Sequence, residues 1–390
     1  MKTQLAVLYG GQNGEHEVSV RSATSIVAGL DRERYEVTEV LVGRDGGWRV
    51  DGEPASLVRA LRVLAAQDVV FPALHGPYGE DGTVASLLEW LGVPYVGNGV
   101  FASAAGMDKA VTKKLLAAEG LRVSPGVTLR PGDDLSPADR RRLGLPVFVK
   151  PARAGSSLGV TRVDDWARLP DALRLAREFD TKILVERSAR GREIDVAVLQ
   201  YPDGRVAAGP PLEISVSGAG FFDYDAKYDG GAVFQIPAPL DPATTALLQD
   251  RAVRAFHTLD CRGLLRVDFF LPDAEPSAAT IGPESAEPGP ESAGTGPESA
   301  GTGPESAGTG PESAAAGPGL AGAGQFGEPV VNEVNTFPGF TDTSQYPRIW
   351  QQAGVEFPAL LDILISGALA GPSRGRLRPG PYRGDRTVGQ

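Results

Sequence analysis

Strands and helices alternate through the first hundred residues, and this rhythm limits the architectures open to the chain. Short apolar runs at residues 4–9, 35–42 and 69–73 predict strands, and stretches at 17–30 and 82–91 predict helices. Consecutive strands that are joined by helices lie parallel in one sheet, because the helical crossover carries the chain back to the same end. We therefore expect an α/β fold that begins with a parallel sheet.

Two further units follow from about Asp108. In the second unit, helices and strands are predicted at residues 109–119, 147–150, 160–163, 167–179, 183–186 and 193–199, with a small-residue loop at 151–159. The third unit is predicted to contain a polar aromatic loop at 218–228, strands at 263–271 and 329–335, and helices at 242–259 and 357–370. The tail from residue 371 is rich in Gly, Pro and Arg and is expected to be disordered.

The charge of the chain is concentrated in one segment. At 390 residues the chain has room for two or three domains, and its formal net charge is −11. Residues 273–328 contribute nine acidic side chains and no Lys or Arg, so the remainder carries only −2. This near-neutral remainder argues against nucleic acid or an anionic membrane as a partner.

Cys261 is the only cysteine, so an intrachain disulfide and a thiolate metal cluster are both excluded. The amino-terminal apolar run at residues 5–8 is too short for a signal sequence. No apolar run approaches the ~20 residues of a membrane-spanning helix. We therefore expect a cytoplasmic protein.

A seven-residue repeat separates the last two predicted strands. The sequence Gly-Pro-Glu-Ser-Ala begins at Gly282, Gly289, Gly296, Gly303 and Gly310. One glycine and one proline in each repeat exclude a coiled-coil helix, and the scarcity of large apolar side chains excludes a core. We expect residues 273–328 to form a disordered insertion at a hairpin tip; a partner-binding segment is the alternative.

Polar side chains alternate with valine on the two strands that flank this insertion. Residues two apart on a strand point to the same face, so Arg266 and Asp268 share a face, as do Glu333 and Asn335. If the strands are neighbours, two carboxylates, an amide oxygen and a guanidinium converge. Oxygen ligands suit Mg²⁺, and a cation beside them suits a transferring phosphate. The alternative is the solvated face of amphipathic strands.

Two strand-to-helix turns carry further candidate residues. The segment from Gly10 to Glu17 follows a strand, and Glu15 is placed to receive a substrate ammonium group. Compensation of the helix dipole is the alternative for Glu15, and a dinucleotide site is another interpretation of the glycines. His75 lies in the second turn, at residues 73–82, where it is either a substrate contact or a polar surface residue.

Lys150 ends a predicted strand directly before a Ser/Gly-rich loop, an arrangement that is able to fold over nucleotide phosphates. It differs from a Walker A loop, which has the lysine inside the loop and a helix after it. Glu186, at the end of another strand, is a candidate acceptor for a ribose or adenine group. The alternative for the Ser/Gly-rich loop is an ordinary turn, and the alternative for Glu186 is an exposed strand end.

Taken in order, these segments resemble the D-alanine–D-alanine ligases of the ATP-grasp superfamily over about residues 5–369, apart from the insertion. The resemblance rests on GGQNGEHEVSVRSA (10–23), ALHGPYGEDG (73–82), MDK (107–109), VKPARAGSSLG (149–159), FFDYDAKY (221–228), RVD (266–268) and NEVNTFPGFTDTS (332–344). It implies an N-terminal Rossmann-like domain followed by a two-subdomain ATP-grasp fold. The implied parts are residues 1–107, 108–204, 205–370 with the insertion, and the tail 371–390.

The resemblance also implies roles for individual residues. Glu15 orients the first D-alanine in a hydrogen-bonded link with Ser156 and Tyr228, and His75, Arg266, Gly339 and Ser344 contact substrate or intermediate. Residues implied to hold ATP are Lys109, Lys150, Glu186, Glu193 and Lys227, the last on the loop 218–228. Two Mg²⁺ ions, with Mn²⁺ as a substitute, are implied at Asp268, Glu333 and Asn335.

The implied reaction joins two D-alanines with ATP through a D-alanyl phosphate, for peptidoglycan precursors, in a cytoplasmic homodimer. Asp342 and Gln345 lie near the implied acceptor pocket and leave the choice between D-alanine and D-serine open. Two other functions compete with this one. A nicotinamide-dependent dehydrogenase would use the first glycine turn, and a non-enzymatic ATP-binding module would use the repeat as a tether.

Overall fold

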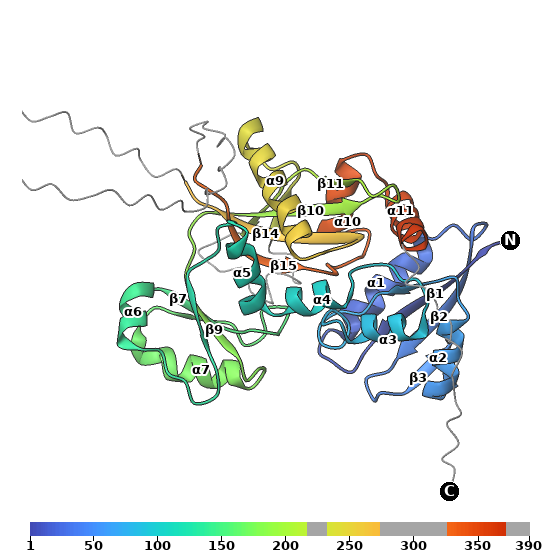
Figure 1. Cartoon of the computed structure of the whole chain (residues 1–390), viewed down its shortest axis with the longest axis horizontal. Helices are drawn as coiled ribbons and strands as arrows, with labels where there is room; N and C mark the ends of the chain where they lie inside the picture. Colours follow the sequence, from blue (N-terminus) through green and yellow to red (C-terminus); the bar gives the residue numbers. More distant parts are fainter. Residues whose placement is uncertain (217–231, 274–325, 372–390) are drawn as a thin grey trace, which may run out of the picture.

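A computed structural model describes residues 1–216, 232–273 and 326–371. Figure 1 shows three units that each contain a sheet, with helices packed against them. The predictions for the loop 218–228, for the five repeats and for the tail beyond residue 371 fall outside the described residues. The same holds for Lys227 and Tyr228.

The first sheet has a parallel centre and an antiparallel edge. Strand β1 (Thr3–Gly10) pairs in parallel with β2 (Tyr35–Val42) and with β5 (Val69–Pro72), as the sequence predicts. A hairpin of β3 (Trp48–Val50) and β4 (Glu53–Ala55) extends the sheet beyond β2. The pattern does not predict this hairpin, because three-residue strands are too short to show a period. The helices of this unit are α1 (His16–Gly29), α2 (Leu57–Ala65), α3 (Thr83–Leu91) and α4 (Val100–Met107).

The second sheet is antiparallel, with the strand order β6-β9-β7-β8. Its strands are β6 (Gly126–Leu129), β7 (Val147–Pro151), β8 (Thr161–Val163) and β9 (Ile183–Arg187). Alternate residues of β7, Val147 and Val149, are buried in a core that also includes Leu173 of the helix packed on this sheet. The helical segments of the unit are α5 (Lys109–Ala118), α6 (Pro137–Leu143), η1 (Trp166–Arg168) and α7 (Leu169–Arg177).

The third sheet is also antiparallel, with the order β13-β12-β10-β14-β15 and with β11 paired to β10. Helix α9 (Pro242–Thr258) covers one face and buries Leu248 and Phe256 against it. The segment that contains the repeats connects the end of β14 to the start of β15, and these two strands pair antiparallel, so the predicted hairpin is confirmed. The strands are β10 (Arg192–Gln200), β11 (Val206–Ala208), β12 (Leu212–Val216), β13 (Ala232–Gln235), β14 (Leu264–Leu271) and β15 (Val330–Asn335).

The last two helices, α10 (Gln345–Gln352) and α11 (Phe357–Ala370), return to the first unit. Figure 1 shows α11 beside α1. Leu5 of β1 and Leu360 of α11 belong to one buried core cluster. No described helix is by itself long and apolar enough to cross a membrane, although α10 and α11 together, bent by 103°, have the length and composition for it.

One buried amide joins the first unit to the third sheet. Asn98 Nδ2 donates to the carbonyl oxygen of Leu264 at 2.7 Å and to that of Thr336 at 2.8 Å. Asn98 Oδ1 accepts from the backbone N–H of Arg262 at 3.0 Å. Because Leu264 begins β14 and Thr336 directly follows β15, this amide fixes the paired strands β14 and β15 relative to the first unit.

Candidate active site

Residues from all three units line a cavity of about 490 Å³. It brings together the predicted site residues within the described part of the chain. These are Glu15, His75, Lys109, Lys150, Ser156, Glu186, Glu193, Arg266, Asp268, Glu333, Asn335, Gly339 and Ser344.

The paired strands β14 and β15 supply one wall of the cavity. Arg266 lies opposite Asn335, and Asp268 lies opposite Glu333, so the predicted convergence of these four side chains is confirmed. Arg266 donates from Nε and Nη2 to the two carboxylate oxygens of Asp268, each at 2.7 Å. Asn335 Nδ2 donates to Asp268 Oδ2 at 3.0 Å. The guanidinium thereby holds the carboxylate in a fixed plane.

A further carboxylate, Asp195, lies on the neighbouring strand β10 and was not singled out from the sequence. It pairs across the sheet with Asp268, is 2% exposed, and has Oδ2 at 3.3 Å from Arg266 Nε. Burial, followed by the charge of Asp268, raises the pKa of Asp195 well above its usual range. Burial would lower the pKa of Arg266, but Asp268 and Asp195 outweigh it and raise that pKa. One guanidinium therefore compensates two carboxyl groups.

The opposite wall carries lysine side chains. Lys150 Nζ lies 3.0 Å from Glu186 Oε2 and donates to Asn332 Oδ1 at 3.3 Å. The other oxygen of Glu186, Oε1, forms an ion pair with Lys113. Glu186 is 2% exposed, so it is not the exposed strand end that was one alternative from the sequence.

Lys109 precedes Lys113 by one helical turn and reaches the cavity itself. Its Nζ donates to the carbonyl oxygen of Ala154 at 2.7 Å and lies 3.7 Å from Glu333 Oε2. Ala154 belongs to the small-residue loop after β7. The contact therefore ties that loop to α5 and places an ammonium group between the loop and β15.

Burial and ion pairing act in opposite directions on the pKa values of this cluster. Burial lowers the pKa of Lys113, and Glu186 only partly offsets it. Burial acts the same way on Lys150, but Glu186 and Glu333 outweigh it and raise its pKa. For Glu186, burial would raise the pKa, yet the charges of Lys113 and Lys150 lower it. Glu186 is thus held as a carboxylate.

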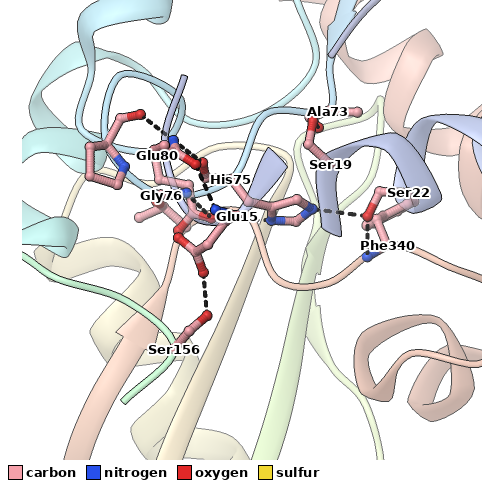
Figure 2. A network of polar contacts seen from close by, with 12 residues as sticks. Glu15, Ser19, Ser22, Ala73, His75, Gly76, Glu80, Ser156 and Phe340 are labelled. Atoms are coloured by element: carbon pink, nitrogen blue, oxygen red, sulfur yellow. Dashed lines mark hydrogen bonds and ion pairs between the residues drawn. The ribbon is translucent and has the colours of Figure 1, made fainter. Parts of the chain in front are cut away.

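Figure 2 shows the polar network around Glu15 and His75. Glu15 caps α1, but its side chain makes no capping hydrogen bond and instead accepts from the hydroxyl of Ser156. Burial and then the charge of Glu80 raise the pKa of Glu15, whereas the Ser156 hydrogen bond opposes the rise. Gly76, with φ of +69°, passes so close to Glu15 that a Cβ atom would collide with its carboxylate.

His75 is 3% exposed, which removes the surface alternative considered from the sequence. Its Nδ1 lies 3.2 Å from Glu80 Oε1, and its Nε2 lies 2.9 Å from Ser22 Oγ (Figure 2). Ser22 Oγ also accepts from the backbone N–H of Phe340 at 3.3 Å. A carboxylate only accepts, so Nδ1 carries a proton, and in the neutral imidazole Nε2 then accepts from Ser22. Ser22 thus links His75 to the loop after β15.

Ser19, one turn earlier on α1, forms hydrogen bonds to both strand-to-helix turns. Its Oγ accepts from the backbone N–H of Gly10 at 2.7 Å and donates to the carbonyl oxygen of Ala73 at 2.5 Å. Ala73 lies beside Ser19 in Figure 2. Ser19 therefore connects the two strand-to-helix turns at the ends of β1 and β5.

The loop after β15 closes the remaining side of the cavity. Ser344 Oγ accepts from the backbone N–H of Thr341 at 3.0 Å, and α10 begins immediately after Ser344. Gln345 lines the cavity, and its Oε1 accepts from Arg266 Nη1 at 2.6 Å. Of the two residues noted for the acceptor side, Gln345 is part of the lining and Asp342 is not.

Sequence reasoning did not single out three residues that hold the site together: Ser22, Lys113 and Asp195. Two of them had a usable signal. Lys113 follows Lys109 by four residues and therefore lies on the same helix face. Asp195 follows Glu193 by two residues, the same spacing as in Arg266 and Asp268. Ser22 gave no signal, because its partners come from loops far away in the chain.

Comparison with known proteins decides between the functions left open by the sequence. Sequence models described as D-ala D-ala ligase N-terminus and D-ala D-ala ligase C-terminus match residues 4–61 and 56–98, and residues 115–279 and 323–366, respectively. A D-alanine--D-alanine ligase of Mycobacterium sp. (strain KMS) is 43% identical over 412 aligned positions, which cover 95% of this chain and 97% of that protein. The chain belongs to the D-alanine–D-alanine ligase family.

Solved structures of the family agree with this assignment. The D-alanine-D-alanine ligase from Coxiella burnetii is 30% identical, with a TM-score of 0.69 and coverage of 94% of both chains. The D-alanine--D-Alanine ligase from Bacillus anthracis complexed with ATP is 25% identical, with a TM-score of 0.69 and coverage of 94% of this chain and 97% of that one. The predicted ATP-grasp fold is therefore confirmed.

The D-ala D-ala ligase C-terminus model also marks where this chain departs from its family. Its two matched segments end at residue 279 and resume at residue 323, so residues 280–322, which contain the five repeats, have no counterpart in it. The repeat is an addition to a family fold rather than a part of it.

Proposed function

We propose that the chain joins two molecules of D-alanine into D-alanyl-D-alanine, at the expense of ATP, for the synthesis of peptidoglycan precursors. The observation that carries the proposal is the single cavity. It holds an acidic subsite at Glu15, lysines from α5 and β7, and the guanidinium–carboxylate wall of β14 and β15, in a chain of the D-alanine–D-alanine ligase family.

The reaction has two steps. A carboxylate oxygen of the first D-alanine attacks the γ-phosphate of ATP, so that D-alanyl phosphate forms and ADP leaves. The amine of the second D-alanine then attacks the acyl carbon, and phosphate leaves with the bonding electron pair. Most of the catalysis is positioning and neutralisation of charge, for which lysine and arginine around one phosphate are well suited.

Each predicted residue has a place in this scheme. Glu15 orients the ammonium group of the first substrate, and Ser156 holds the carboxylate of Glu15 in place. Arg266 and the backbone at Gly339 steady the transferred phosphate and the tetrahedral intermediate, and Ser344 contacts the carboxylate of the second substrate. Further assignments are His75 and Tyr228 near the first substrate, Lys109, Lys150 and Lys227 at the phosphates, and Glu186 and Glu193 at the nucleoside.

Asp268, Glu333 and Asn335 fit two Mg²⁺ ions, with Mn²⁺ as a substitute. No three His, Cys, Asp or Glu side chains are arranged to hold a metal ion within the described ranges, so the donor set needs the amide of Asn335. All of its donors are oxygen atoms, which suits a hard divalent cation, and Asp268 and Glu333 lie directly opposite each other. When bound, Mg²⁺ neutralises phosphate charge and orients the phosphate oxygens.

The proposal includes an arrangement of the whole chain. Residues 1–107 form the first domain, residues 108–204 the central ATP-grasp subdomain, and residues 205–370 the C-terminal one. The enzyme works as a homodimer in the cytoplasm, with small molecules rather than nucleic acid or membrane as partners.

The decisive experiment measures ATP-dependent phosphate release with a panel of D-amino acids and D-hydroxy acids. We expect turnover with D-alanine alone, preference for D-alanine over D-serine as acceptor in equal mixtures, and poor use of D-lactate at neutral pH. If D-alanyl-D-serine dominates the product, the acceptor assignment is wrong although a ligase remains. Nucleotide binding without phosphate release for every acceptor would overturn the enzyme assignment.

A further inference from the structure

A lysine that does not line the cavity is buried directly behind it. The side chain of Lys113 is 7% exposed, and its ammonium pairs with Glu186 Oε1. Glu186, whose side chain is 2% exposed, pairs through its other oxygen with Lys150 at 3.0 Å. Glu186 and Lys150 both line the cavity, whereas Lys113 is set back from it. The three groups form a row in which the middle carboxylate is shared.

Counting charges shows what the set-back lysine adds. Lys150 and Glu186 alone would form a neutral buried pair, and a neutral pair has little attraction for a polyphosphate. With Lys113 included, one carboxylate is shared by two ammonium groups and the row carries a net positive charge. Because Lys113 and Glu186 are almost wholly buried, this excess charge is little screened and attracts phosphate.

Geometry supports the same conclusion. Lys150 also donates to Asn332 Oδ1, so its ammonium is held between two oxygen acceptors rather than drawn wholly to Glu186. Lys113 occupies the far oxygen of Glu186 and thereby fixes the orientation of the carboxylate that Lys150 contacts. The removal of Lys113 would leave Glu186 with Lys150 as its remaining ion-pair partner among the described residues.

We propose that Lys113 is a positioning residue for nucleotide phosphates. It acts through Glu186, and it keeps the charge of Lys150 available to the phosphates. The inference rests on the proposed function, because Lys150 is assigned there to ATP. It adds a residue outside the cavity on which affinity for the phosphates depends more strongly than affinity for the nucleoside, which Glu186 also contacts under the proposed function.

The test compares binding of ADP and of adenosine by titration calorimetry in the full chain. In Lys113→Met, ADP affinity is expected to fall by about 10-fold to 100-fold, the range for a lost charge-assisted contact, while adenosine affinity falls clearly less. Lys114→Met is the matched control, because it removes the same charge from the next residue, which is exposed. It should leave both affinities as they are.

Two more variants keep the test decisive if Lys113→Met folds poorly. Lys113→Arg keeps the charge and should bind ADP nearly as wild type does. The double variant Lys113→Met/Glu186→Gln removes one charge of each sign, so its ratio of ADP to adenosine affinity should return towards the wild-type ratio. Equal losses of affinity for ADP and for adenosine in Lys113→Met would overturn the proposal. It would also be overturned if Lys113→Met folds and the double variant shows no higher ratio of ADP to adenosine affinity than that single variant.

These measurements do not require turnover. If the chain binds ADP but releases no phosphate with any acceptor, the proposed function fails while the role of Lys113 is still measured. If phosphate release is robust and Lys113→Met binds ADP as tightly as wild type, the role of Lys113 fails and the ligase assignment stands.

Discussion

Ser22 and His75 are joined by a hydrogen bond of 2.9 Å between the serine Oγ and the imidazole Nε2. Because the same hydroxyl accepts from the N–H of Phe340, Ser22→Ala leaves two buried polar groups without that partner. We expect a loss of about 1–3 kcal/mol in the free energy of unfolding and about a tenfold fall in kcat/KM for D-alanine. Denaturant unfolding and steady-state kinetics measure the two effects.

Thr24→Ala is the control for this variant. Thr24 lies on the same helix, and its exposed hydroxyl donates only to the carbonyl oxygen of Val20 among the contacts described for it. Its kinetics should match wild type. Unchanged kinetics in Ser22→Ala would contradict the link between α1 and the loop after β15.

Glu333→Gln should leave the fold intact and nearly abolish turnover. The substitution keeps the shape of the side chain but removes the carboxylate that faces Asp268 and lies 3.7 Å from Lys109 Nζ. Phosphate release at saturating Mg²⁺ measures the effect, and circular dichroism checks the fold. Glu328→Gln is the matched control, since Glu328 pairs with Arg251 at 2.7 Å and does not line the cavity. Activity within a few-fold of wild type for Glu333→Gln would refute the metal assignment.

Ser156→Ala should move the acid limb of the pH profile of kcat/KM for D-alanine to higher pH. The pKa of Glu15 is raised by burial and by Glu80, and the Ser156 hydrogen bond opposes the rise. Loss of that bond raises the pKa further, so protonation removes the carboxylate at a higher pH as the solution is acidified. Glu80→Gln should shift the limb the opposite way. Shifts of equal sign in the two variants would exclude Glu15 as the group that titrates.

Deletion of residues 276–324 should leave activity and melting temperature nearly unchanged. Asp273 and Phe326 already pair across the base of the segment, and the N–H of Gly327 donates to the carbonyl oxygen of Pro272 at 2.9 Å. Three residues would then connect Asp273 to Phe326. A shorter loop loses less entropy on closure, so any change in stability should be a small gain. A large loss of activity would show that the repeat takes part in catalysis.

The regular parts of the fold were predictable because their signal is local. The alternation of β1, α1 and β2 and the same-face spacing of Arg266 and Asp268 depend on neighbours in the chain. Helix α10 was not predicted, since its run Gln345–Gln352 has a proline and few apolar residues, and it is fixed by the burial of Tyr346 and Trp350 in the shared core. The sharing of Glu186 by two lysines likewise depends on a tertiary contact between α5, β7 and β9.

The core that joins β1 to α11 has a consequence for folding during translation. Leu5 and Val7 belong to the same buried cluster as Leu360 and Ile365. A ribosome adds about 5–20 residues per second, so the first strand waits for roughly tens of seconds before its last packing partner is synthesised. During that time α1 is already available to pack against β1, but the part of this core that α11 completes stays uncovered. Each seven-residue copy of the repeat between β14 and β15 adds about 0.4–1.4 s to that wait at these rates, so the insertion postpones completion of the core that β1 and α11 share.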